Sequence, residues 1–508
     1  MSEKRDSCVN MAASKEYREL LEMIKDLSTL EQVVSILGWD EQTYMPAGGA
    51  PDRGTQKAAI IGIMHERLTS KRMEKLIRTL KKQELSPDGQ IVLREVERKW
   101  RRALSMPLEL VKEITRTGTM SVEAWARARK SSDFRVMEPW LNNMIGLKMK
   151  EAEHVGYDDR PYDALLDEYE PCMRSKELDA LFSRLRYKLV PIAEKVLDAP
   201  EPKSTPFTGD YPWDMQRKFI ADLCGGIGYD MNCGRIDLSA HPFTTGSARD
   251  VRITVRYDEK NPAYAIFPAI HETGHALYEQ GFREKYFGTP LAESVSLGIH
   301  ESQSRLWENV VGRSMPFWTF YYPVMQRTFR GMKKMSLEQF HRRINTVRRS
   351  YIRVDADELT YNLHVMLRYE IESAIFAGKL KTGEIPEFWN DRFERYLGIE
   401  VPDDTHGCLQ DVHWAWGSFG YFPTYALGNL YSAQLWGAAK RKVAGLEDRI
   451  ASGDTAALLW WLRDNVHRHG KRYCASDLIT KATGERPSED HFIRYVKEKY
   501  GNIYGISL

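Results

Sequence analysis

The chain has 508 residues and nearly balanced charge, with 73 Lys and Arg against 71 Asp and Glu and a net charge of +2. This balance argues against a surface built to bind nucleic acid or an anionic membrane. The longest plainly apolar run, residues 456–462, is far too short to cross a bilayer. Because no Ser/Gly-rich linker, low-complexity stretch or repeat interrupts the sequence, we expect residues 1–508 to form a single domain.

The N-terminus and the cysteines both bear on location. Residues 1–6 contain no hydrophobic secretory core. No C-x-x-C pair occurs among the six cysteines, which are Cys8, Cys172, Cys224, Cys233, Cys408 and Cys474. This scattered pattern predicts reduced thiols and a cytoplasmic protein.

Helical patterning dominates from the first segment onward. Apolar residues between Tyr17 and Leu27 recur at helical spacing, and Ser14 is placed to cap that helix. Strand-like sequence is scarce outside residues 237–257, where residues 251–257 alternate strictly. The chain is therefore predicted to be mainly α, with one small β-sheet.

Residues 271–275, His-Glu-Thr-Gly-His, carry the strongest chemical signal in the chain. On a helix, His271 and His275 lie one turn apart on one face and can hold a single metal ion. Glu272 then projects beside that metal, where its carboxylate can accept a proton from water. This HExxH pattern is typical of zinc peptidases.

The residues around this motif favour a helix over residues 262–280, ending near Gly281. Pro268 is awkward inside a helix, because proline removes a backbone hydrogen bond. It either kinks the helix or marks its true first turn. In both cases the two histidines lie on continuous helix, and the small sheet is expected to flank it.

A zinc peptidase needs a third protein ligand and an open fourth coordination position. Glu301, in a second helix expected to begin near Ala292, is the best candidate, and Glu293 is the competing acid. Alternatively, Glu301 is a solvated helix carboxylate paired with Arg305 four residues on. Beside the HExxH motif we favour the ligand role. Two His and one carboxylate suit Zn²⁺ but would also accept Co²⁺ or Mn²⁺.

Six short motifs follow one another along the second half of the chain. They are His-Pro-Phe at 241–243, Asp-Val-Arg-Ile-Thr at 250–254, the HExxH motif, His-Glu-Ser-Gln-Ser at 300–304, Ile-Arg-Val-Asp-Ala-Asp at 352–357 and Gly-Cys-Leu-Gln-Asp-Val-His-Trp at 407–414. Together they resemble the carboxypeptidase Taq family of zinc metallocarboxypeptidases, over nearly the whole chain. The resemblance implies a two-lobed helical body with a deep active-site cleft, similar to the neurolysin-like oligopeptidases, and a homodimer.

An enzyme that trims C-termini must recognise a free carboxylate, and the planar arginine fork matches one. The resemblance places the substrate's terminal carboxylate on Arg353, whose alternative role is an ion pair with acids at 355–358. Arg252 is a second candidate, although without the resemblance we would prefer to interpret it as a solvent-facing strand residue. His241 is expected near the cleft, with no defined role.

Peptide hydrolysis also needs a donor for the oxyanion that forms at the attacked carbonyl. Residues 410–425 supply histidine and tyrosine densely, and their glycines and proline suggest a loop beside a cleft. We favour His413 and Tyr425 as the substrate-facing pair. The alternative is aromatic packing around Trp414, Trp416 and Phe419, which we prefer for Tyr421.

Three functions fit these residues. The favoured one is a zinc-dependent metallocarboxypeptidase that releases single C-terminal amino acids, with Glu272 assisting attack by a metal-bound water. The second is a helical endo-oligopeptidase, which needs no carboxylate anchor such as Arg353. The third is a catalytically silent zinc protein that binds a partner, which the intact Glu272 argues against.

Overall fold

The computed structural model describes residues 14–508, which form twenty α-helices and one three-stranded sheet. The prediction of a mainly α fold with one small sheet is confirmed. The first nine helices are α1 (Lys15–Thr43), α2 (Ala50–Leu68), α3 (Lys71–Leu80), α4 (Pro87–Ser105), α5 (Leu108–Ser131), α6 (Glu138–Val155), α7 (Pro161–Tyr169), α8 (Ser175–Asp198) and α9 (Trp213–Gly226).

The remaining helices follow the sheet in the sequence. They are α10 (Ala263–Glu279), α11 (Leu297–Arg305), α12 (Met315–Thr328), α13 (Leu337–Ile344), α14 (Glu358–Phe376), α15 (Ile385–Leu397), α16 (Phe422–Lys442), α17 (Leu446–Ala451), α18 (Ala456–Asn465), α19 (Ala475–Thr483) and α20 (Asp490–Tyr504). No helix between residues 14 and 508 is long and apolar enough to span a membrane.

The sheet consists of β1 (Gly234–Leu238), β2 (Thr244–Ser247) and β3 (Asp250–Val255) in the order β1-β3-β2. The central strand β3 pairs parallel with β1 and antiparallel with β2. Its alternating apolar residues are fully buried, as the strict alternation predicts. The edge strand β2 contacts the HExxH helix, because the hydroxyl of Thr244 donates to the carbonyl oxygen of Glu272 at 2.9 Å. The sheet therefore flanks α10, as expected.

The first helix, α1, begins and packs as its sequence predicts. The hydroxyl of Ser14 accepts a hydrogen bond from the backbone N–H of Tyr17 at 3.2 Å, and so caps the helix. Near its other end, Trp39 lies under the guanidinium groups of Arg235 and Arg252 at 4.8 and 4.3 Å. These contacts fix α1 to strands β1 and β3.

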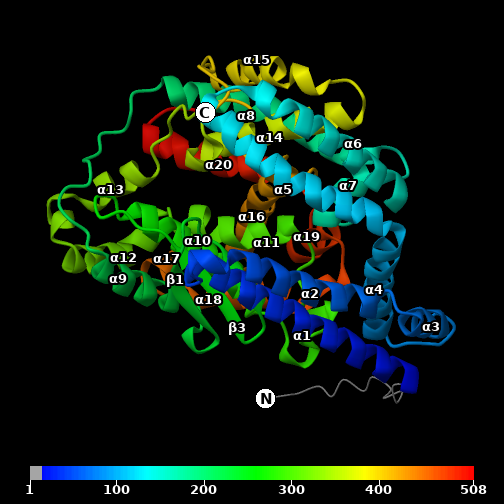
Figure 1. Cartoon of the computed structure of the whole chain (residues 1–508). Helices are drawn as coiled ribbons and strands as arrows, with labels where there is room; N and C mark the ends of the chain where they lie inside the picture. Colours follow the sequence, from blue (N-terminus) through cyan, green and yellow to red (C-terminus); the bar gives the residue numbers. More distant parts are fainter. Residues whose placement is uncertain (1–13) are drawn as a thin grey trace, which may run out of the picture.

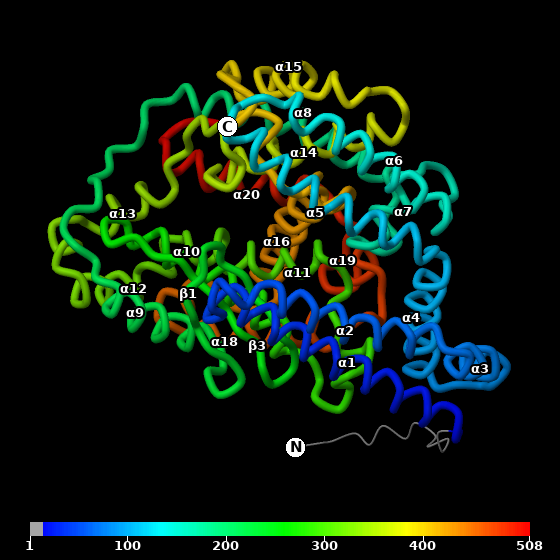
Figure 2. The backbone as a smooth tube through the Cα atoms, viewed as in Figure 1, coloured from blue at the N-terminus to red at the C-terminus, as the bar shows by residue number. Residues whose placement is uncertain are grey.

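The helices lie in two groups, which agrees with the predicted two-lobed body. In Figure 1 the upper group contains α5–α8, α14, α15 and α20, and the lower group contains α9–α13, α17, α18 and the sheet. The tube in Figure 2 shows α16 in the middle, between the two groups. Most of α16 is buried, including its polar residues Asn429, Ser432 and Gln434, as its central position requires. That residues 1–508 form one domain stays a prediction.

The prediction of reduced cysteines is wrong for one pair. Cys172, in the turn between α7 and α8, forms a disulfide with Cys474, which directly precedes α19. The two residues are 302 positions apart in the sequence but have Cα atoms 6.1 Å apart. Such a pairing leaves no local spacing signal. Cys224, Cys233 and Cys408 are free thiols, and Cys8 lies outside the described residues.

Candidate active site

Helix α10 carries the HExxH motif at its buried centre. It runs from Ala263 to Glu279, so Pro268 lies inside the helix and not in its first turn. The described helix ends one turn after His275, close to the predicted end at Gly281. His271 and His275 therefore lie one turn apart, as the spacing predicts.

The second helix, α11, begins at Leu297 and not near Ala292 as expected. Ser296 determines this start, because its hydroxyl accepts the backbone N–H of Ile299 at 3.1 Å. The segment before it holds the competing acid, Glu293, which pairs with Lys471 at 2.6 Å and Lys99 at 3.1 Å. Glu293 is thus engaged by two lysines and takes no part in the histidine cluster.

Two glycines let α11 approach its neighbours closely. A Cβ on Gly274 of α10 would come within 2.6 Å of the Cα of Ser304. A Cβ on Gly428 of α16 would lie 2.5 Å from the Cγ of Glu301. Since real side chains do not approach so closely, only glycine fits at either position. Helix α11 is held between α10 and α16, and this packing positions Glu301.

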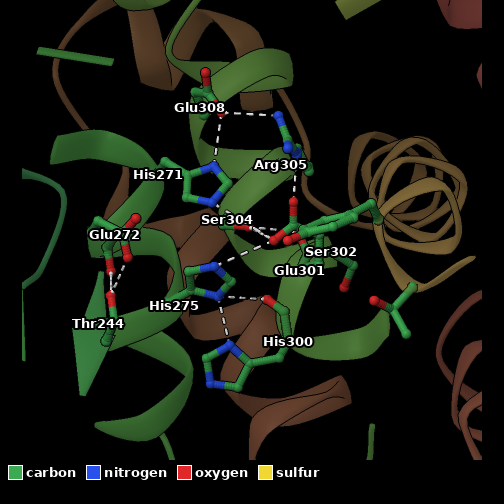
Figure 3. Close-up of polar contacts among 12 residues, drawn as sticks. Thr244, His271, Glu272, His275, His300, Glu301, Ser302, Ser304, Arg305 and Glu308 are labelled. Carbon is green, nitrogen blue, oxygen red and sulfur yellow. Dashed lines mark hydrogen bonds and ion pairs between the residues drawn. The ribbon is translucent and has the colours of Figure 1, made fainter. Parts of the chain in front are cut away.

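His271, His275 and Glu301 converge on one point, as Figure 3 shows. The Oε2 atom of Glu301 lies 3.7 Å from Nε2 of His271 and 3.3 Å from Nε2 of His275. One possible ligand atom from each residue lies within 4.8 Å of the others. Two imidazole nitrogens and one carboxylate oxygen are a donor set suited to zinc, and the residues therefore fit a divalent metal.

The outer ring nitrogens of both histidines are already engaged. Nδ1 of His271 lies 2.8 Å from Oε2 of Glu308, and Nδ1 of His275 lies 3.1 Å from the carbonyl oxygen of His300. These partners fix each ring and leave both Nε2 atoms facing Glu301. Glu308 lies in a π-helical turn at residues 306–311, directly after α11.

The two carboxylate oxygens of Glu301 face different partners, and the side chain is buried and not solvated. Nε of Arg305 donates to Oε1 of Glu301 at 2.6 Å, which is the expected pairing four residues on. The other oxygen, Oε2, faces the histidines. Arg305 itself lies over the ring of Tyr361 at 4.4 Å. The ion pair therefore orients the carboxylate and does not remove it from the cluster.

Burial sets the charges at the cluster. Burial and the neighbouring His300 lower the pKa of His275 to about 3, so its imidazole is neutral, which is the form that binds metals. Burial alone would raise the pKa of Glu301, but Arg305 and His271 bring it well below its usual value. The pKa of Glu272 is raised by burial, against the opposing effects of His271 and the Thr244 hydroxyl. A raised pKa suits a carboxylate that must accept a proton.

Arg353 is buried, with 5% of its surface exposed, and does not pair with the acids at 355–358. Its Nη2 donates to Oδ1 of Asp411 at 2.8 Å, and its Nη1 donates to the hydroxyl of Tyr361 at 2.7 Å. Because Tyr361 also lies against Arg305, a single side chain separates Arg353 from the arginine that orients Glu301.

His413 and Tyr425 lie together beside Arg353. Nε2 of His413 is 3.4 Å from the hydroxyl of Tyr425, whose ring centroid is 5.0 Å from the Arg353 guanidinium. Burial lowers the pKa of His413 to about 4, with a further contribution from Arg353, so this imidazole is neutral. The ring of Tyr421 packs against His413 and Tyr425, at 5.5 and 5.3 Å, so it lies beside the favoured substrate-facing pair and its packing role stays a prediction. Trp416 is 57% exposed and is not part of a buried aromatic core.

Two predicted substrate residues lie apart from these groups. Arg252 donates to both oxygens of Asp250 at 2.8 Å and covers Trp39, so it is not a solvent-facing strand residue. His241 is exposed. Among the described residues, neither makes a hydrogen bond or ion pair to His271, His275 or Glu301. Their substrate roles stay predictions.

Several residues at the site were not anticipated from the sequence. Thr244 donates to Oε2 of Glu272 at 2.6 Å, and nothing in its local sequence indicates this contact. Glu308 has a signal, because Glu301, Arg305 and Glu308 follow helical spacing. The position of Arg368 also carries a signal, since it is the only Lys or Arg between residues 359 and 376, in a largely apolar segment.

A family model described as carboxypeptidase Taq (M32) metallopeptidase matches residues 19–500. The chain belongs to this family. Thermostable carboxypeptidase 1 of Thermus thermophilus is 39% identical over 504 residues, which cover 96% of this chain and 99% of that protein. Carboxypeptidase 1 of Bacillus subtilis is 38% identical, with 96% of this chain and 98% of that protein covered.

Solved structures of the M32 family have the same architecture. The M32 carboxypeptidase from Deinococcus radiodurans R1 superposes with a TM-score of 0.95 at 38% identity, covering 97% of this chain and 100% of that one. The chain is therefore a peptide hydrolase of the metallocarboxypeptidase type, and membership of a metallopeptidase family implies a divalent metal.

Proposed function

We propose that this enzyme is a zinc-dependent carboxypeptidase that removes one C-terminal amino acid at a time, with His271, His275 and Glu301 as the metal ligands. The observation that carries the proposal is a buried guanidinium, that of Arg353, linked to the metal-ligand helix through Tyr361. A fixed positive group near the cluster is what an enzyme requires to measure the last peptide bond from a free C-terminus.

Glu272 acts as the general base in this proposal. A divalent ion, when bound, supplies Lewis acidity that polarises the scissile carbonyl and lowers the pKa of water. Thr244 holds Oε2 of Glu272 at 2.6 Å, which leaves Oε1 to accept the proton of the attacking water. Glu272 then returns that proton to the departing amine.

His413 and Tyr425 act as donors to the oxyanion. A neutral His413 can carry its proton on Nε2, the nitrogen that faces the Tyr425 hydroxyl at 3.4 Å. Either group can donate a hydrogen bond to the carbonyl oxygen as it gains negative charge. Arg353 holds the substrate carboxylate, and so fixes which carbonyl reaches Glu272. The enzyme is further proposed to be a cytoplasmic homodimer.

The test is the digestion of two matched peptides, one with a free and one with an amidated C-terminus, followed by mass spectrometry. We expect stepwise loss of single residues from the free peptide alone, and no cleavage by the Glu272→Gln variant. Internal cuts in both peptides would instead indicate an endopeptidase. If neither peptide changes, and the variant behaves like the native enzyme, a binding role becomes the better account. Elemental analysis of the purified protein identifies the metal.

A further inference from the structure

Arg368 lies directly behind the proposed carboxylate anchor. It belongs to α14, its side chain is fully buried, and all three nitrogens of its guanidinium are engaged. Nε donates to Oδ2 of Asp411 at 2.6 Å, Nη2 to Oε1 of Gln410 at 2.8 Å and Nη1 to the carbonyl oxygen of His364 at 2.7 Å. Arg353, whose side chain is 6% exposed, binds the opposite oxygen, Oδ1, of the same aspartate.

Arg353 and Arg368 thus share the single carboxylate of Asp411, so these three side chains together carry one net positive charge. The other nearby acids have different partners. Asp357 caps α14, and Glu358 binds Lys499 at 2.6 Å. The carboxylate of Glu372 accepts hydrogen bonds from three donors, the Tyr162 hydroxyl, the Trp414 indole and the Gly420 backbone N–H. None of these three acids makes a hydrogen bond to either arginine.

The surplus charge matters for binding. An incoming carboxylate that met only the Arg353–Asp411 pair would be attracted by the guanidinium and repelled by the aspartate. Without Arg368 the site would be a neutral ion pair. Burial, with a contribution from Arg353, lowers the pKa of Arg368 only to about 10, so it stays charged at neutral pH.

We propose that Arg368 is a positioning residue that neutralises Asp411 from behind, so that Arg353 presents a net charge of +1 to the substrate's terminal carboxylate. This inference rests on the proposed role of Arg353 as the carboxylate anchor. Arg368 does not touch the substrate. Through Gln410, whose Oε1 also accepts the backbone N–H of Arg353 at 3.0 Å, Arg368 additionally fixes the backbone of the anchor.

The experiment measures binding without turnover. In the metal-loaded Glu272→Gln enzyme, calorimetry gives the Kd of one N-acetylated dipeptide acid and of its amide. The variants Arg368→Met, Asp411→Asn and their double mutant are compared in that background. In the proposal, the net charge of residues 353, 368 and 411 together is 0 in Arg368→Met, +2 in Asp411→Asn and +1 in the double mutant. Arg392→Met, which removes an ion-paired arginine of α15, is the matched control. Thermal melting monitors the fold of each protein.

We expect Arg368→Met to weaken acid binding by roughly 10- to 100-fold with little effect on the amide, the range that a charge supplies at an effective dielectric constant of about 20. The double mutant should regain most of this loss, although it removes more of the native contacts. A double mutant that binds the acid as weakly as Arg368→Met, or more weakly, overturns the proposal, because a purely structural role predicts that result.

The remaining outcomes separate this inference from the proposed function. If the Glu272→Gln enzyme itself binds acid and amide equally well, the anchor role of Arg353 has failed. If that enzyme prefers the acid and Arg368→Met keeps the full preference, only the role of Arg368 is overturned. If Arg368→Met does not fold, the Asp411→Asn variant tests the proposal instead. A stronger preference of that variant for the acid over the amide supports the proposal, and a loss of that preference contradicts it.

Discussion

At the scale of single residues, the carboxylate of Glu301 is divided between two partners. Arg305 holds Oε1, while Oε2 faces His271 and His275. Nδ1 of His271 contacts Glu308, and Nδ1 of His275 contacts the carbonyl oxygen of His300. Each proposed ligand is therefore held by a second group, which reduces the conformational freedom that metal binding must remove.

The partner of His271 leads to the first prediction. We expect Glu308→Gln to weaken metal binding by roughly 10- to 100-fold, because it removes the charged acceptor that orients the imidazole. The measurement is metal retention in a titration with a chelator. Glu447→Gln, an exposed glutamate of α17, should bind metal as the native enzyme does. Equal retention by Glu308→Gln and the native enzyme would show that the contact does not support the metal.

A second prediction concerns acid stability. Lys471 and Lys99 lower the pKa of Glu293 to about 2, although burial opposes them. Its stabilising contribution is therefore complete above the unfolded pKa near 4.5 and is lost as the pH falls towards 2. Because 30% of the Glu293 side chain is exposed, we expect its ionised form to contribute only about 1–2 kcal/mol to the free energy of unfolding. The stability difference between the native protein and Glu293→Gln should shrink from pH 6 to pH 3. A constant difference in urea unfolding would contradict this.

At the scale of elements, the site depends on how closely three helices approach. The HExxH helix α10 supplies Gly274 and the central helix α16 supplies Gly428, and α11 lies against both glycines. The position of Glu301 is therefore decided by the packing of helices that are separate in the sequence. Its own helix, only nine residues long, could not fix it alone.

This packing predicts the effect of one methyl group. Gly428→Ala should push Glu301 away from the histidines, weaken metal binding and destabilise the fold by about 1–3 kcal/mol, since the added Cβ would overpack the contact. Thermal melting and chelator titration measure the two effects. Gly437→Ala, on the same helix, is the control, because its Cβ would meet only atoms at 3.7 Å or more. If the two variants behave alike, close helix approach is not what positions Glu301.

At the scale of the whole molecule, the Cys172–Cys474 disulfide joins the turn after α7 to the start of α19. Cross-linking residues 302 positions apart restricts the unfolded chain strongly. We expect Cys172→Ser, or reduction of the native enzyme, to lower stability by about 2–4 kcal/mol. Cys233→Ser, which removes a free thiol, should melt like the native protein. An unchanged melting temperature after reduction would show that the bond does not stabilise the fold.

Local patterns in the sequence determined the type of protein. The spacing of His271, Glu272 and His275 requires only one turn of helix, so it could be recognised without the fold. The same holds for the cap at Ser14 and for the alternation in β3, because both depend on neighbouring residues. The six ordered motifs then indicated the family that the comparisons confirm.

The tertiary structure decided everything that depends on long-range contacts. Only the fold shows that Glu293 is held by two lysines, that Arg353 pairs with an aspartate 58 residues away, and that Cys172 meets Cys474. Each of these contacts joins side chains from different elements, whose meeting depends on the packing of the whole core. The sequence by itself therefore determined which chemical groups are present and the helices that carry them. Which of those groups face one another was decided by the packing, because no local spacing encodes it.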